Sequence, residues 1–303
     1  MTDPLRAPPA DRSAAELLAF GVVNLDKPAG PSAHQVAGWV RDMAADAATD
    51  LAPEGPTVDR AAHAGTLDPK VTGCLPMLLG EATRMAQVFL EGRKEYVAVL
   101  ELHGPAPTNL ESVLAEFEAP LYQKPPRKSA VSRRLRVREI HELELLDVTD
   151  RQALIRIQCE SGTYVRKLCH DLGLALGTGA HMGHLRRTAT DPFDDTTLVD
   201  LHSLTDALEF AREDDPSLLR EIVQPAERAL THLPSVEIAP SAARQVATGA
   251  PVYAPGVIDA DEADDGALVA CYTPDGSAVC LGTLVGDPDA DSGEVVDLER
   301  VLV

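Results

Sequence analysis

The stretch HAGTLDPKVTG, residues 63–73, lies between an acidic, proline-rich segment and an apolar pattern of helical spacing. Two glycines and a proline in eleven residues break regular elements, so the stretch is predicted to be a loop. Asp68 stands directly before Pro69, and aspartate before proline is a common turn former. It could also be a reactive carboxylate that the turn exposes. Local rules alone favour the turn former, so the flanking segments have to decide.

On the N-terminal side, VVNL (22–25) has the pattern of a short buried strand, and KPAGP (27–31) is a turn. Ser32 then begins a helix, with Gln35 three residues on as its capping-box partner. Residues 44–60 are rich in Ala, Asp and Pro, and they are predicted to form a surface loop.

On the C-terminal side, EATRMAQVFLE (81–91) is helical, and KEYVAVLELHG (94–104) and ALIRIQC (153–159) alternate as half-buried strands. A helix is predicted over 163–177, with Gly177 at its C-terminus, and helical patterns return over 198–230. Past LPSVEIAP (233–240), short strands and turns indicate a small β-barrel-like module of about 70 residues. The chain is therefore predicted to be a mixed helix-and-sheet body followed by a β module.

The composition argues for a cytoplasmic protein. No run of 18 apolar residues is present, and the N-terminus lacks an apolar signal segment. The five cysteines are an odd number without CxxC spacing, which favours free, buried thiols over zinc ligands, disulfides or a catalytic cysteine. The net charge is −21, with 6 lysines against 21 arginines, as in proteins kept soluble at high salt. We therefore hypothesise a halophilic source.

The charge is distributed unevenly. Residues 121–140 carry seven Lys or Arg and one acid, whereas residues 234–303 carry 13 acids and two arginines. A basic island in an acidic chain indicates a local anionic partner. The candidate RNA contacts in this island are Lys124, Arg127, Lys128, Arg133 and Arg134.

Three segments together resemble one family, the TruB/dyskerin class of pseudouridine synthases. They are VNLDKPAGPSAHQV, HAGTLDPKVTGCLPMLLGEATR, and ESGTYVRKLCHDLG followed by HMGHLRRTATDPF. QKPPRKSAVSRRLRVREIHELELL and IVQPAERALTHLP are similar to the archaeal and eukaryotic branch, and the C-terminal part resembles a PUA domain. The acidity of the PUA-like part and the tail DADSGEVVDLERVLV depart from the family pattern.

The resemblance implies an α+β fold, with a mixed-sheet catalytic core and a small C-terminal β-barrel PUA domain. The implied boundaries are an N-terminal extension (1–20), a catalytic domain (21–232) and a PUA domain (233–303). It further implies an isomerase that converts uridine to pseudouridine in rRNA or tRNA without cofactor, metal or membrane. As the catalytic subunit of an H/ACA particle it would bind a guide RNA and its rRNA substrate, possibly tRNA. It would also bind a scaffold peptide, a glycine–arginine-type protein and a kink-turn-binding ribosomal protein.

Asp68 corresponds to the essential aspartate of the family, and the resemblance makes it the catalytic residue. By the same resemblance, Tyr96 stacks on the target uracil, and Tyr164 and Leu185 line the pocket. Arg166 matches the family's arginine. A fixed guanidinium is a natural counter-ion for a carboxylate in a desolvated pocket.

Other polar residues of these segments have less defined roles. His63 is expected to lie beside the displaced base or to position RNA, and acid–base chemistry is the less favoured role. Lys27 is expected to brace the Asp68 loop or to meet phosphate. Arg84, Arg186 and Arg187 are phosphate or structural contacts, and Arg244 is the candidate RNA contact of the PUA-like part.

Three alternatives to the guided enzyme stay open on the sequence. The first is a stand-alone tRNA pseudouridine-55 synthase. The second is a non-catalytic RNA-binding scaffold, which the presence of Asp68, Tyr96 and Arg166 disfavours. The third is a retaining glycosidase, which needs a second carboxylate about 5.5 Å from Asp68; the second motif supplies only Glu81, which has no reason to face it.

Overall fold

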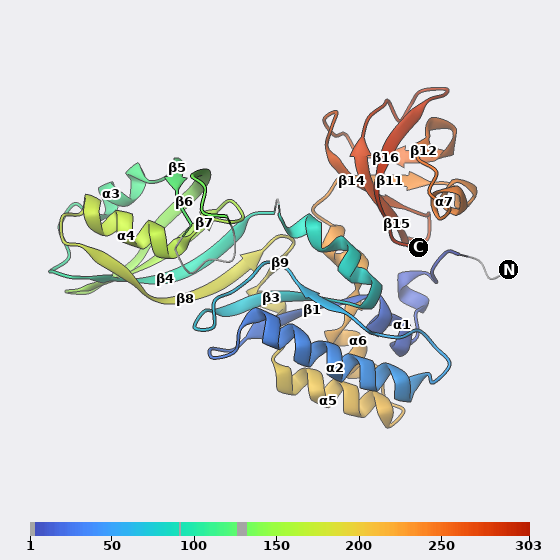
Figure 1. Ribbon diagram of the computed structural model, residues 1–303, viewed down its shortest axis with the longest axis horizontal. Coiled ribbons are helices and arrows are strands. Elements are labelled where there is room, and N and C mark those ends of the chain that lie inside the picture. Colours follow the sequence, from blue (N-terminus) through green and yellow to red (C-terminus); the bar gives the residue numbers. More distant parts are fainter. Residues whose placement is uncertain (1–3, 91, 126–131) are drawn as a thin grey trace.

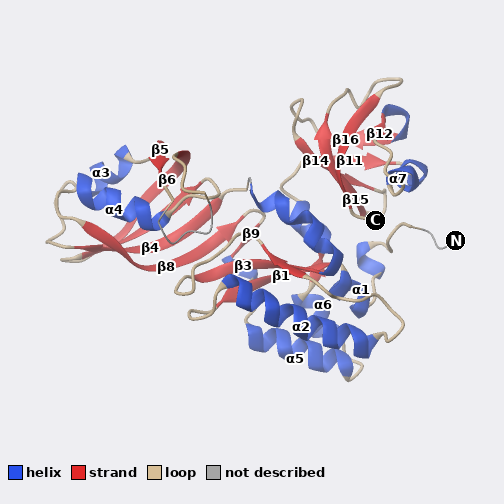
Figure 2. Cartoon of the chain, in the orientation of Figure 1, coloured by secondary structure: helices blue, strands red, loops and turns tan. Residues whose placement is uncertain are grey.

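The computed structural model describes residues 4–90, 92–125 and 132–303 and contains two sheets (Figures 1 and 2). The larger sheet has ten strands in the order β10-β1-β3-β8-β4-β7-β6-β5, with β2 paired to β3 and β9 paired to β8. Its strands are β1 (Gly21–Lys27), β2 (Ala61–His63), β3 (Thr72–Leu79), β4 (Lys94–Leu102), β5 (Pro120–Gln123), β6 (Arg136–Val148), β7 (Gln152–Cys159), β8 (Ala180–Thr190), β9 (Phe193–Asp194) and β10 (Gln224–Pro225).

Helices cover the two halves of this sheet separately. The α-helices are α1 (Ala14–Ala19), α2 (Ala33–Leu51), α3 (Leu110–Glu116), α4 (Val165–Ala175), α5 (Leu201–Arg212) and α6 (Ser217–Ile222). The 3₁₀ helices are η1 (Pro9–Asp11), η2 (Gly80–Leu90), η3 (Asp195–Thr197) and η4 (Ala226–Leu230). Figure 1 shows α2 and α5 against the half with β1 and β3, and α3 and α4 against the half with β6 and β7.

The strands and caps follow the sequence patterns. In β4, Tyr96, Ala98 and Leu100 face the core, and the residues between them are more exposed. Ser32 and Gln35 form the predicted capping box at the start of α2. Gly177 follows α4 with a φ of 73°, the left-handed conformation that ends a helix at low cost for glycine.

The predicted surface loop over 44–60 is wrong for its first half, because α2 continues to Leu51. Ala44, Ala47 and Ala48 are buried at helical spacing against the core. Alanine has the highest helix propensity, so this Ala-rich segment extends the helix although it lacks large apolar side chains.

Strand β3 was not predicted, because Gly73 and Pro76 obscure its pattern. β3 pairs with β8 only at Thr72 and Gly73, and with β2 only from Met77 to Leu79. Pro76 lies opposite Asn24 of β1, and its carbonyl accepts the Ala64 N–H on the other edge of the strand, between these two stretches. Both main-chain groups of a residue in an antiparallel pair point to the same edge, so the N–H group that Pro76 lacks would point away from β1, where no strand is paired with it. The strand can therefore contain a proline inside the sheet.

The second sheet contains six strands in the order β12-β16-β15-β14-β11-β13. They are β11 (Ser235–Ile238), β12 (Val252–Tyr253), β13 (Val257–Ala260), β14 (Leu268–Tyr272), β15 (Ala278–Leu284) and β16 (Glu294–Val301), accompanied by α7 (Pro240–Val246) and the 3₁₀ helix η5 (Ala254–Gly256). The tail that the sequence could not place forms β16, which pairs with β12 and β15. The predicted mixed α+β architecture with a β module is confirmed.

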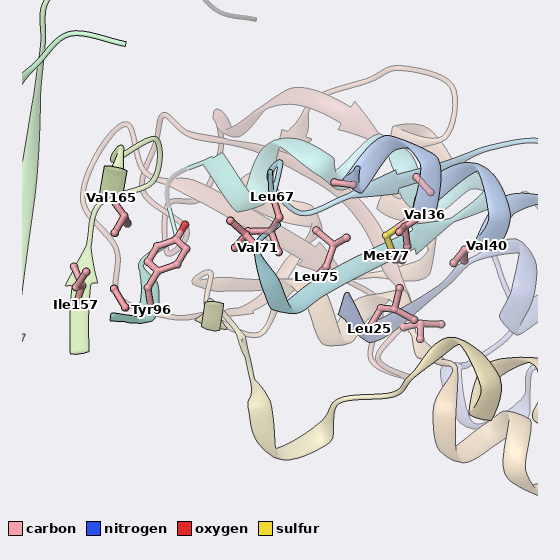
Figure 3. Packing of buried hydrophobic residues seen from close by; sticks show 14 of the residues in the cluster. Leu25, Val36, Val40, Leu67, Val71, Leu75, Met77, Tyr96, Ile157 and Val165 are labelled. Atoms are coloured by element: carbon pink, nitrogen blue, oxygen red, sulfur yellow. The ribbon is translucent and has the colours of Figure 1, made fainter. Parts of the chain in front are cut away.

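The two sheets share one apolar cluster, in which Phe20 and Leu78 of the first part lie with Leu281 and Leu302 of the second. The sheet core itself continues from α2 through β3 to Tyr96 and Val165 (Figure 3). No helix among the described residues has the length and apolar character that a membrane crossing requires.

Candidate active site

The Asp68 loop connects β2 to β3 and is held by main-chain bonds at its C-terminal end. The Val71 N–H donates to Asp68 O at 3.0 Å, and the Gly30 N–H of the KPAGP turn donates to Pro69 O at 2.8 Å. The Asp68 side chain is about half exposed. The turn predicted from the sequence therefore presents the carboxylate at the surface.

The Asp68 carboxylate contacts Arg166, the second residue of α4. The Arg166 Nη2 lies 2.8 Å from Asp68 Oδ2, and both side chains remain partly open to solvent. The structure thus brings together the two residues that the family motif places more than 90 positions apart. The pair joins the loop to the start of the helix that follows β7.

Lys27 lies beneath the same loop and is fully buried. Its ammonium donates to Pro28 O at 2.8 Å, Pro69 O at 3.2 Å and Val71 O at 2.9 Å. Burial lowers the pKa of the Lys27 ammonium, and the negative charge of Asp68 opposes this effect. In this conformation Lys27 is a brace of the loop and has no access to a phosphate.

Tyr96 is nearly buried on β4, and Figure 3 shows its ring between Ile157 and Val165 on one side and Val71 and Leu67 on the other. Burial raises the pKa of the Tyr96 hydroxyl, and the positive charge of Arg187 partly opposes this. The hydroxyl is therefore neutral at physiological pH. An aromatic ring held this way can offer its face or edge to a base entering beside the loop.

Two further predicted residues lie close to this centre. Tyr164 is the N-cap residue of α4, and its N–H donates to the Gln123 side chain at 2.8 Å. Leu185 lies on β8 opposite Ala98 of β4, and it packs against the core that contains Tyr96. The sequence analysis missed Gln123. A polar residue at a buried position of a strand was the only signal for it.

His63 ends β2, opposite Met77 of β3. Burial lowers the pKa of its imidazole, so the ring is neutral at pH 7. No hydrogen bond joins His63 to Asp68 in the described part of the chain. This arrangement is compatible with a role beside the base and offers no direct relay to the carboxylate.

The basic island leaves β5 beside the start of α4, because Gln123 is bonded to Tyr164 there. Lys124, Arg133 and Arg134 are exposed, and Arg133 donates to Pro125 O. Arg127 and Lys128 lie outside the described residues. Arg244 is exposed on α7 of the second sheet, so the structure does not bring it to the Asp68 site (Figure 1).

The cysteines provide no nucleophile. All five are buried and free, and burial raises the pKa of Cys74, Cys159 and Cys169 to about 12. Within the described ranges, no group of three or more His, Cys, Asp or Glu side chains could hold a metal ion. Glu81, the second carboxylate of the motif, pairs with Arg60 at 2.7 Å. The chemistry available at this site therefore centres on one carboxylate.

Four family models match the chain in sequence order. They are the DKCLD domain (residues 4–37), the TruB family pseudouridylate synthase N-terminal domain (55–109), the tRNA pseudouridylate synthase B C-terminal domain (166–231) and the PUA domain (234–302). The last three cover the Asp68 loop, the helix with Arg166 and the second sheet.

Relatives and solved structures match over nearly the full length. The "Probable tRNA pseudouridine synthase B" of Halobacterium salinarum is 63% identical and covers 99% of both chains. A chain in the crystal structure of a Cbf5-Nop10-Gar1 complex is 41% identical with a TM-score of 0.89, covering 99% of this chain and 90% of that one. A chain of an H/ACA RNP bound to a substrate RNA containing 2′-deoxyuridine is 38% identical with a TM-score of 0.87, covering 100% and 91%.

Fold, motifs and relatives together define a class: the pseudouridine synthases, which are isomerases. Within it, the chain belongs to the TruB family, in the branch that carries DKCLD and PUA domains. The resemblance drawn from the three motifs is confirmed, and so is the haloarchaeal hypothesis, since the similar relatives include Halobacterium salinarum. The glycosidase and scaffold alternatives find no support in these relatives.

Proposed function

We propose that this synthase is the catalytic subunit of an H/ACA ribonucleoprotein, in which a guide RNA selects the uridine. The observation that carries the proposal is the whole-length similarity to chains solved in Cbf5-Nop10-Gar1 and substrate-bound H/ACA complexes. The partners are then a guide RNA, an rRNA substrate, a Nop10-type scaffold peptide, a Gar1-type glycine–arginine protein and a kink-turn-binding ribosomal protein. The cytoplasm is the compartment that fits them.

A stand-alone tRNA synthase is the second candidate. The observation that favours it is the name of the haloarchaeal relative, which is a tRNA pseudouridine synthase B. Both candidates use the same site, and they differ only in what presents the uridine to it.

The reaction moves uracil from an N1–C1′ bond to a C5–C1′ bond. The proton on C5 is lost and N1 ends protonated, so no oxidant, reductant or cofactor enters the balance. Asp68 is the reacting group in our proposal. It either attacks C1′ or abstracts a proton, and a carboxylate is capable of both. Arg166 fixes and neutralises it.

The remaining residues handle the RNA. The target nucleotide must leave its stack, at a cost of a few kcal/mol. Tyr96 offsets this cost by stacking on the uracil, with Tyr164 and Leu185 as walls of the pocket and His63 beside the space left by the base. Lys27 acts only through the loop that it holds.

Phosphate contacts come from the basic island in this proposal, through Lys124, Arg133 and Arg134 together with Arg127 and Lys128. Arg244 is the candidate contact of the PUA domain (residues 233–303), which follows an N-terminal extension (1–20) and a catalytic domain (21–232). Because phosphate binding weakens steeply with salt, stacking and shape must supply more of the affinity in a halophile.

Reconstitution with guide RNA, target RNA and the three partner proteins tests the proposal. Pseudouridine is mapped chemically for the wild type and for Asp68→Asn, on the guided target and on unguided tRNA. Conversion that requires the guide supports the first candidate, and conversion of tRNA alone supports the second. Activity that survives Asp68→Asn refutes the site assignment.

A further inference from the structure

Two adjacent arginines of β8, Arg186 and Arg187, lie in very different surroundings. Successive residues of a strand point to opposite faces of the sheet. Arg186 is partly exposed, and its Nη1 and Nη2 each lie 3.0 Å from an oxygen of Asp26. Arg187 is fully buried. A phosphate role is therefore closed to Arg187 in this conformation, and its buried charge needs another explanation.

The partners of the Arg187 guanidinium are main-chain carbonyls of the HAG turn (residues 63–65) and of β3. Its Nε donates to Cys74 O of β3 at 2.7 Å, and its Nη2 approaches Ala64 O at 3.2 Å and Gly65 O at 3.3 Å. Among the described residues, no carboxylate forms a salt bridge with it. Burying a charged group is costly unless hydrogen bonds compensate it, so these carbonyls are held tightly in place.

The positive charge of the same guanidinium opposes the rise that burial causes in the pKa of the Tyr96 hydroxyl. Tyr96 of β4 is the direct cross-strand partner of Arg187, so both side chains lie on the same face of the sheet. One rigid, planar group thus bonds the turn that leads into Asp68, and it belongs to the residue that pairs directly with the ring expected to meet the uracil.

The backbone of β3 is built for close approach to this arginine. Gly73 pairs with Arg187 and has a φ of 98°, and a Cβ placed there would lie 2.2 Å from Arg187 O. Only glycine combines this conformation with this separation. The position of Arg187 relative to the loop is consequently fixed by main chain on one side and by hydrogen bonds on the other.

We propose that Arg187 is a positioning residue that locks the Asp68 turn and the Tyr96 ring into one geometry, so that carboxylate and ring meet the flipped base together. The inference deepens the proposed function, since it concerns the same site. Arg187 acts through other groups and does not itself touch the RNA.

Single-turnover kinetics on saturating RNA test the functional half of this inference. Arg187→Met keeps the length of the side chain and removes every donor. The conversion rate is expected to fall about 100-fold, which is the loss expected when reacting groups are misplaced by about 1 Å. The dissociation constant of the RNA should stay unchanged. Arg156→Met, at a partly exposed arginine of β7 that pairs with Glu144, is the control and should show no resolvable change in rate. Equal losses in both variants, or a loss confined to RNA affinity, overturn the proposal.

Hydrogen exchange of the free protein tests the mechanical half without any activity. Exchange across residues 63–71 should accelerate in Arg187→Met and remain as in the wild type in Arg156→Met. This result separates the inference from the proposed function, because it is readable even if the wild type modifies no RNA. Unchanged exchange of the loop in a folded Arg187→Met protein overturns the inference.

If Arg187→Met does not fold, Arg187→Lys and Tyr96→Phe replace it. Lysine keeps the charge but loses the planar fork, and phenylalanine keeps the ring but loses the hydroxyl. Because both changes alter the same cross-strand pair, their effects on the conversion rate should be less than additive in a double-mutant cycle. Strict additivity contradicts a shared positioning role.

Discussion

Two of the arginine–carboxylate pairs in the described part of the chain have the same chemistry and lie in opposite surroundings. In the Asp68–Arg166 pair, the carboxylate and guanidinium side chains are 48% and 44% exposed. In the Arg12–Glu227 pair they are 11% and 2% exposed, at 2.7 and 2.6 Å in a bidentate contact. The first pair lies where the proposed function requires RNA to bind, and the second lies in the interior of the folded chain.

The buried pair connects three parts of the chain. Arg12 belongs to the N-terminal segment, and Glu227 belongs to η4 and also accepts the Ala278 N–H of β15 at 3.1 Å. Nearby, Arg6 donates to Leu302 O from the same segment. The pair therefore fixes the second sheet against the first, whereas the Asp68–Arg166 pair is left open and would be desolvated only when RNA covers it.

The largest effect is expected at the open pair, in activity and not in stability. Asp68→Asn should lower pseudouridine formation about 10³-fold or more, because it removes the only reacting carboxylate of the proposed site. The free energy of unfolding should change by no more than about 1 kcal/mol, since the pair is half exposed. Chemical mapping and thermal melting on the same preparation check both statements. A large loss of stability would mean that Asp68 is structural.

The buried pair should show the reverse. Arg12→Met leaves the Glu227 carboxylate buried without its counter-ion, and it should lower the free energy of unfolding by about 3–5 kcal/mol. The double variant Arg12→Met/Glu227→Leu removes both charges and should recover much of that loss. Denaturant unfolding measures all three proteins. A double variant as unstable as Arg12→Met would show that the unpaired buried charge is not the cause of the lost stability.

Lys94 extends the comparison to a buried cation with no carboxylate in salt-bridge contact among the described residues. Its ammonium donates to Phe89 O at 2.9 Å, and burial, assisted by the charge of Arg187, lowers its pKa to about 8. Below pH 8 the ammonium is protonated in both states. Between pH 8 and its ordinary pKa of about 10.4, only the unfolded chain holds the proton, so stability rises with pH.

The increase in the free energy of unfolding that Lys94 causes should reach roughly 3 kcal/mol. It is measured as the difference between the wild type and Lys94→Met in unfolding experiments from pH 7.5 to 10. Taking this difference removes the contribution of the buried cysteine thiols, which is the same in both proteins. These thiols titrate in the same pH range, and their contribution to the free energy of unfolding has the opposite sign. A difference that does not change with pH would contradict the lowered pKa.

Arg166→Lys should cost less than the loss of the carboxylate. Lysine keeps the positive charge but not the planar fork or its reach, so the conversion rate should fall by about 10- to 100-fold with little change in melting temperature. Arg156→Lys, on the neighbouring strand β7 and away from Asp68, is the control. Turnover close to the wild type in Arg166→Lys would end the proposal that a fixed guanidinium orients Asp68.

The sequence predicted the parts of this comparison that depend on local patterns. A short apolar run identified β1, and alternation identified β4 and β7. The capping box identified the start of α2, and three motifs pointed to Asp68 and Arg166. It could not reveal that Lys27 and Arg187 are buried, because their partners are main-chain carbonyls of a distant loop. Nor could it pair Arg12 with Glu227, which are 215 residues apart and carry no motif that local rules detect.

The smallest expected effect is the response of the two pairs to salt, which should weaken the interaction in the exposed pair and not in the buried pair. At molar KCl the Debye length is near 3 Å, so exposed charges are screened and buried ones much less so. A double-mutant cycle on stability with Asp68→Asn and Arg166→Met should give at most about 1 kcal/mol at low salt and approach zero at molar KCl. The corresponding cycle with Arg12→Met and Glu227→Leu should keep its value. In the same series the wild-type melting temperature should rise with KCl, because screening relieves the repulsion of a chain with net charge −21. If both cycles decline together, the buried pair is reached by solvent and the distinction between the two pairs fails.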